Sequence, residues 1–61
     1  MLPREMKAKI LQRLREFERK YGYSSDTFYD LVQEGEIEVE GVPELEEWYR
    51  LVSLYLNAAE G

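Results

Sequence analysis

The chain has 61 residues, contains neither Cys nor His, and carries a formal net charge of −5. This length allows one domain, residues 1–61, with a core too small to provide much stability by itself. The missing Cys and His exclude disulfides and the usual zinc sites, and no EF-hand spacing is present, so we expect no metal or other cofactor. Small domains without such supports are commonly stabilised by association, and we therefore expect either a homo-oligomer, most simply a dimer, or a partner-bound state.

The hydropathy of the chain indicates its compartment. No apolar run approaches the roughly 18–20 residues that span a bilayer. The first residues also lack the apolar region of a signal peptide. We therefore expect a cytoplasmic protein without membrane contact.

Charge is divided unevenly along the chain. Residues 1–20 carry seven Lys and Arg against three Glu, whereas residues 21–61 carry ten acidic groups against Arg50 alone. Two explanations are open. Either the two halves attract each other within the fold, or the asymmetry marks an interaction tail or two electrostatically different faces.

Residues 3–21 are predicted to form the first helix. Apolar side chains recur there at spacings of three and four residues, which places them on one helical face: Met6, Ile10, Leu14, Phe17 and Tyr21. Pro3 suits the first turn of a helix, where its missing N–H would be unpaired anyway. Gly22 is expected to end the helix in the left-handed conformation.

The residues after Gly22 specify a turn and a second helix over residues 25–34. Ser24 is predicted to be the N-cap, with its hydroxyl accepting from the N–H of Asp26 or Thr27. This assignment places Tyr23 and Phe28 at the two positions of a hydrophobic staple. No base lies nearby in sequence to activate the serines as nucleophiles, so capping is the preferred interpretation. Gly35 is expected to end this helix.

The segment 36–42, EIEVEGV, alternates charged and apolar residues with the period of a half-buried strand. Ile37 and Val39 would share one side of it, and three Glu residues the other. A single strand cannot satisfy its own backbone groups. Three arrangements are therefore open: an extended loop over the helices, a ribbon paired with a second copy, or a strand added to a partner's sheet.

Residues 43–58 are predicted to form the third helix, with Pro43 in its first turn. Its inward stripe is expected to contain six residues: Leu45, Trp48, Val52, Tyr55, Leu56 and Ala59. Three large side chains fall outside this stripe, and we predict that they contact another chain: Tyr49, Leu51 and Leu54. The expected fold is thus an all-α homodimer of three-helix chains, with an extended acidic segment at 36–42.

Catalysis finds little support in the sequence. Paired carboxylates can act as acid and base when their environments separate their pKa values. Here seven Glu residues crowd positions 34–47, a composition typical of a solvated acidic surface. We therefore predict that the protein is not an enzyme.

Nucleic-acid binding is the weakest of the functional alternatives. The first helix could contact phosphates through three basic side chains: Lys7, Arg15 and Arg19. The second helix would occupy the position of a recognition helix after the turn, but its Asp26 and Asp30 would be repelled by a duplex. The overall acidity of the chain also argues against nucleic-acid binding.

An acidic segment with apolar residues between its carboxylates suits a basic protein partner better. Clustered carboxylates steer association toward a cationic surface, and apolar anchors add affinity. The residues predicted to bind such a partner are Glu36, Ile37, Glu38, Val39, Glu40, Glu44 and Glu47.

Several short motifs are spread over the chain: Lys20-Tyr21-Gly22, Ser24-Ser25, Phe28-Tyr29, Gly35-Glu36, Glu47-Trp48 and Tyr55. In this order they resemble small prokaryotic antitoxin-like proteins of type II toxin–antitoxin systems. The resemblance covers roughly residues 10–56. It implies an antitoxin that neutralises a basic toxin, often a ribonuclease encoded beside it. The alternative is a self-associating structural protein without a toxin partner.

Overall fold

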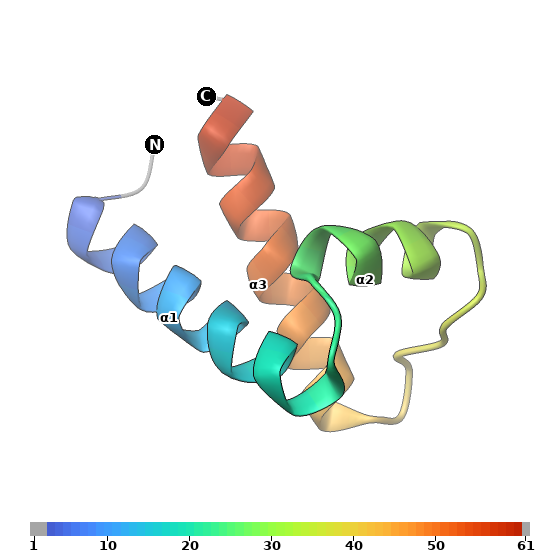
Figure 1. Ribbon diagram of the computed structural model, residues 1–61. Helices are drawn as coiled ribbons and strands as arrows, with labels where there is room; N and C mark the ends of the chain where they lie inside the picture. The colour runs from blue at the N-terminus through green and yellow to red at the C-terminus, as the bar shows by residue number, and fades with distance from the viewer. Residues whose placement is uncertain (1–2, 61) are drawn as a thin grey trace.

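The computed structural model describes the backbone of residues 3–60 and the side chains of residues 3–57. It contains three helices, α1 (Arg4–Tyr21), α2 (Ser25–Gln33) and α3 (Pro43–Glu60), and residues 3–60 contain no strand (Figure 1). The predicted all-α fold is confirmed. The predicted boundaries differ from the observed ones by one or two residues, because helix ends are the least specified part of a helical pattern.

The three helices enclose one core, and each contacts the other two. In Figure 1, α1 and α3 diverge toward the ends of the chain, and α2 packs beside α3. This divergence explains one difference from expectation: Met6, on the predicted inward stripe of α1, is 50% exposed. Further along the same stripe, Ile10, Leu14 and Phe17 are buried as predicted.

Trp48 lies at the centre of the core and is fully buried. Its ring is nearly parallel to that of Phe28, at 2°, with the centroids 3.9 Å apart. Three more aromatic rings surround it at centroid distances of 5.3–5.5 Å: Phe17, Tyr21 and Tyr23. The indole N–H donates to the hydroxyl of Ser25 at 3.0 Å, so the one polar group of this side chain is satisfied. Trp48 therefore joins all three helices.

The turn between α1 and α2 has the predicted local structure. Gly22 ends α1 with a φ of 85°, and its N–H donates to the carbonyl of Glu18 at 2.8 Å. The hydroxyl of Ser24 accepts from the N–H of Thr27 at 3.2 Å, which makes Ser24 the N-cap of α2. The staple also forms, with 6.5 Å between the ring centroids of Tyr23 and Phe28.

The inward stripe of α3 agrees with the sequence pattern over most of its length. Trp48 and Val52 are buried, and three further residues are half-buried against the core: Leu45, Tyr55 and Leu56. The side chain of Ala59, the last residue predicted for this stripe, lies outside the described residues.

Candidate protein-binding surface

The path of the acidic segment is set at the end of α2. Gly35 adopts a φ of 80°, a left-handed conformation that residues other than Gly rarely adopt. The chain then turns back on the helix, where the carbonyl of Leu31 accepts from the N–H groups of both Glu36 and Ile37, at 2.9 and 3.3 Å. These bonds satisfy the last turn of α2 and hold the start of the acidic segment.

Within one chain, residues 36–42 form a loop over the helices, the first of the three arrangements left open by the sequence. The side chains of Ile37 and Val39 are half-buried against the core. The carboxylates that alternate with them are exposed: Glu36, Glu38 and Glu40. The period-two pattern therefore predicted correctly which side chains face the protein, although no strand forms.

The loop ends in a second turn before α3. Gly41 has a φ of 86°, and the N–H of Val42 donates to the carbonyl of Val39 at 3.0 Å. The carboxylate of Glu46 reaches back to accept from the N–H of Gly41 at 3.3 Å. The loop is therefore fixed at both ends by hydrogen bonds and in its middle by two apolar side chains.

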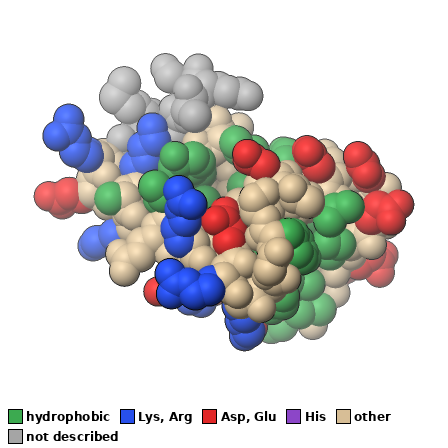
Figure 2. Space-filling model, in the orientation of Figure 1, with side chains coloured by type: hydrophobic (Ala, Val, Ile, Leu, Met, Phe, Trp, Pro, Cys, Tyr) green, Lys and Arg blue, Asp and Glu red, His purple; other side chains and the backbone are tan. Residues whose placement is uncertain are grey.

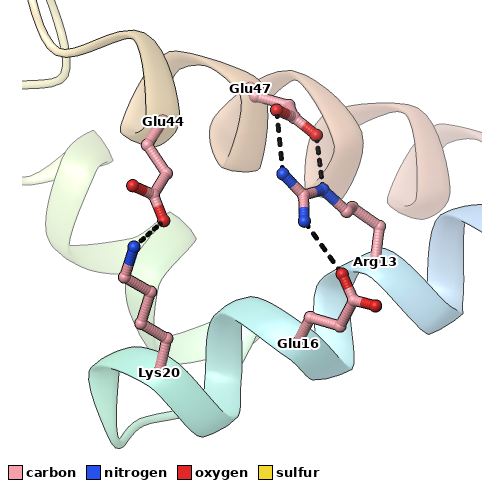
Figure 3. A network of polar contacts seen from close by, with 5 residues as sticks. All are labelled: Arg13, Glu16, Lys20, Glu44 and Glu47. Atoms are coloured by element: carbon pink, nitrogen blue, oxygen red, sulfur yellow. Dashed lines mark hydrogen bonds and ion pairs between the residues drawn. The ribbon is translucent and has the colours of Figure 1, made fainter.

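Arg13 on α1 joins the basic first half of the chain to α3 (Figure 3). Its Nε and Nη2 donate to the two oxygens of Glu47 at 2.7 and 3.3 Å, and its Nη1 donates to Glu16 at 2.8 Å. The guanidinium carbon also lies 4.5 Å from the centroid of the Phe17 ring. Hydrogen bonding to Glu47 and Glu16 raises the pKa of Arg13, and the same contact with Arg13 lowers the pKa of Glu47.

A second ion pair lies one helical turn nearer the beginning of α3. The Nζ of Lys20 is 2.6 Å from Oε1 of Glu44, and this hydrogen bond raises the pKa of Lys20 (Figure 3). The two pairs show that the oppositely charged halves attract each other within the fold. Two residues of the predicted partner-binding set, Glu44 and Glu47, are therefore already paired with cations of the same chain.

Most of the acidic groups outside these ion pairs lie on α2 and the loop that follows it, although Glu5 lies on α1. Figure 2 shows Lys and Arg side chains over α1, and Asp and Glu side chains over α2 and the region that follows it. The acidic loop, defined here as residues 34–40, contributes four exposed carboxylates: Glu34, Glu36, Glu38 and Glu40. None of the four forms an ion pair with another residue of the described part of the chain.

The three side chains predicted to contact another chain have different environments. Tyr49 is half-buried, stacks on Tyr29 with the ring centroids 5.5 Å apart, and accepts a hydrogen bond from Gln33 at 2.6 Å. Leu51 is half-buried against the core, whereas Leu54 is 43% exposed. An open groove of about 480 Å³ lies beside Tyr49 and Leu54, and Leu51 is not part of it. The groove is lined by Val39, Glu46, Tyr49, Arg50, Ser53, Leu54 and Asn57.

The three basic side chains considered for phosphate contact lie along α1. The Nζ of Lys7 is 5.7 Å from the centroid of the Tyr55 ring, and Nη1 of Arg15 is 3.8 Å from a carboxylate oxygen of Glu18. Arg19 is exposed. Two of the three cations thus have an aromatic or acidic neighbour within the chain.

Comparison of the chain with protein-family models, with curated proteins and with solved structures finds no match. Among the described residues, no group of acidic side chains is arranged to hold a metal ion. No helix in the described part of the chain combines the length and apolar character needed to cross a membrane. The functional argument therefore depends on the chain's own surface and on the resemblance of its short sequence motifs.

Proposed function

We propose that this protein is a binding module that holds a cationic surface of a partner protein against its acidic loop. The observation that supports the proposal is the alternation within that loop. Ile37 and Val39 attach it to the core, and the carboxylates of Glu36, Glu38 and Glu40 are exposed to solvent. The loop thus presents several negative charges on a fixed backbone.

Such a surface suits fast and selective association. Clustered exposed carboxylates attract a cationic partner over a distance and raise the rate of encounter. A loop already held in one conformation loses less entropy on binding than a free segment does. In this arrangement Ile37 and Val39 position the loop, and the partner contacts the Glu side chains that alternate with them.

The ion pairs narrow the proposed contact set. A partner that engaged Glu44 or Glu47 would have to displace Lys20 or Arg13, which already supply the opposite charge. Binding to the four carboxylates of the acidic loop requires no such displacement: Glu34, Glu36, Glu38 and Glu40. We therefore assign the partner-binding role to the acidic loop and an intramolecular role to Glu44 and Glu47.

The partner we propose is a basic toxin, with this chain as its antitoxin in a type II pair. The resemblance over roughly residues 10–56 supports this choice. A ribonuclease binds RNA phosphates in a cationic cleft, and the carboxylates of the loop could occupy that cleft in their place. The proposal requires no catalytic group in this chain, and places its action in the cytoplasm.

Co-purification tests the proposal. The tagged chain is co-expressed with the product of the reading frame encoded beside it, and we expect a small basic protein to be retained. The variant Glu36→Gln/Glu38→Gln/Glu40→Gln should lose it. A control with the same charge change, Glu5→Gln/Asp26→Asn/Asp30→Asn, should keep it. Failure of the neighbouring product to co-purify with the wild-type chain would end the antitoxin proposal.

A further inference from the structure

A row of four side chains runs along the outward side of α3 from its first turn. Val42, Glu46, Arg50 and Leu54 follow one another at intervals of four residues. Residues with this spacing form one ridge on a helix surface. Val42 belongs to the ridge although it precedes the helix, because its carbonyl accepts from the N–H of Glu46 at 2.9 Å. We call these four residues the α3 ridge.

The two apolar ends of the α3 ridge are unusually exposed. Val42 is 42% and Leu54 43% exposed, and among the described residues the third exposed large apolar side chain is Met6 on α1. Between the two ends lie an acid and a base. Arg50 is the one basic residue after position 20, is exposed, and forms no ion pair within the described part of the chain.

The order of these side chains is self-complementary. From either end, the α3 ridge presents an apolar residue, two opposite charges and another apolar residue. When a second ridge is laid against it in the opposite direction, Val42 meets Leu54 and Glu46 meets Arg50, twice each. A two-fold interface requires this reciprocity, in which residue i contacts residue j and residue j contacts residue i.

We propose that the α3 ridge is the docking surface for a second copy of this chain. The two α3 helices run in opposite directions and cross at about 50°, the angle at which rows of four-residue spacing lie alongside each other. Glu46, Arg50 and Leu54 also line the groove of about 480 Å³ together with Val39 and Tyr49. A side chain from the second copy therefore meets apolar surface as well as opposite charge.

The antiparallel arrangement also keeps the acidic loops apart, which matters for a chain with a net charge of −5. Twelve residues of helix rise by about 18 Å, so each acidic loop lies near the Leu54 end of the other copy's ridge. That separation exceeds the screening length of about 8 Å at physiological ionic strength. The loop carboxylates lie outside the α3 ridge, and of the loop residues only Val39 lines the groove, so this inference is independent of the proposed antitoxin role.

Charge swaps provide a test in which two defective variants restore each other. Sedimentation equilibrium from about 1 µM to about 1 mM covers the affinities expected of a short interface. Wild-type chain should become dimeric as the concentration rises. Glu46→Arg and Arg50→Glu should each be monomeric alone, because like charges then meet twice. Mixed in equal amounts, the two variants should form a heterodimer, and the double swap should recover the homodimer.

Loss of apolar surface provides a second, matched test. Val42→Ser/Leu54→Ser should weaken association, whereas Met6→Ser removes an equally exposed apolar side chain from α1 and should leave it unchanged. Far-UV circular dichroism checks that each variant folds. Glu46 also accepts from the N–H of Gly41, a bond that is lost both in Glu46→Arg and in the double swap that contains it. If these two variants misfold, the folded Arg50→Glu and Val42→Ser/Leu54→Ser variants decide the test.

Three results would overturn the proposal. These are a wild-type chain that stays monomeric over the whole range, a folded Arg50→Glu variant that still dimerises, and folded single variants that do not pair when mixed. The variant Glu36→Gln/Glu38→Gln/Glu40→Gln should dimerise like the wild type. Loss of partner binding and loss of self-association are therefore separable.

Discussion

The indole of Trp48 lies flat on the ring of Phe28, with 3.9 Å between centroids and 2° between planes. Both side chains have no exposed surface. Their stacking joins α2 to α3, and the rings of Phe17 and Tyr21 add α1 to the same cluster. A large share of the apolar burial in this small domain thus converges on one residue, which makes its removal a severe test of the fold.

Trp48→Ala should unfold the chain. Truncating a buried Trp costs about 3–5 kcal/mol, which is comparable with the entire folding free energy of a domain of this size. Thermal melting followed by circular dichroism should show no cooperative transition for this variant. Met6→Ala, a truncation at an exposed site, should melt close to the wild type. A cooperative Trp48→Ala transition at the wild-type temperature would contradict the description of the core.

Ser25→Ala should destabilise the fold by leaving the buried indole N–H of Trp48 without an acceptor. An unsatisfied buried donor costs about 1–3 kcal/mol. In a Trp48→Phe background the indole is absent, so the same Ser25→Ala change should cost less. Chemical denaturation of the wild type, the two single variants and the double variant gives the coupling free energy between the two side chains directly. Equal costs in the two backgrounds would show that the hydroxyl stabilises the fold in another way.

Glu47→Gln should produce a stability difference that depends on pH. Hydrogen bonding to Arg13 lowers the pKa of Glu47 in the folded chain below its ordinary value of 4.5. The charged carboxylate therefore contributes stability above that ordinary value, and the contribution is lost as the pH falls through the lowered, folded-state pKa. The variant should melt below the wild type at neutral pH, and the two should converge in acid.

The control for this pH experiment is Glu40→Gln. Glu40 is exposed and forms no ion pair with another described residue, so its neutralisation should give a much smaller difference with little pH dependence. Added salt should also reduce the Glu47→Gln difference, because the ion pair is solvent-accessible. If the difference in melting temperature between Glu47→Gln and the wild type persisted unchanged in acid, it would contradict the role given to the pair with Arg13.

Ile37→Ser/Val39→Ser should release the acidic loop without changing its charge. Both side chains are half-buried against the core, and their loss removes the apolar contacts that fix the middle of the loop. A Glu-specific protease should then cleave the loop faster than in the wild type, since cleavage requires local opening. Val42→Ser, at an exposed position, should not accelerate cleavage. Unchanged rates in the double variant would show that the terminal turns alone hold the loop.

Local signals in the sequence specify much of this fold. Residues within a few positions of one another decide three of its features: the helix end at Gly22, the N-cap at Ser24, and the hydrophobic staple between Tyr23 and Phe28. The side chains of Ile37 and Val39 face the core as the period of two predicts, although the backbone pairs with no other strand. Burial periodicity therefore survives even where the secondary structure differs from the one it usually indicates.

Contacts between distant positions are not specified in this way. Arg13 and Glu47 are 34 residues apart, and Ser25 and Trp48 are 23 apart, so their pairing depends on how the helices cross. The same reason applies to Tyr49, predicted to contact another chain, which within one chain stacks on Tyr29. The sequence indicates which surfaces are acidic or apolar, and the crossing of the helices decides which of them are already occupied.

The most direct test of the partner-binding role is a calorimetric titration of the folded chain with the basic product of the neighbouring reading frame. We predict binding that weakens as salt is raised, and that is lost in Glu36→Gln/Glu38→Gln/Glu40→Gln while the control Glu5→Gln/Asp26→Asn/Asp30→Asn retains it. Absence of binding by the wild-type chain, or equal affinity of the loop variant and the wild type, would contradict the role proposed for the acidic loop.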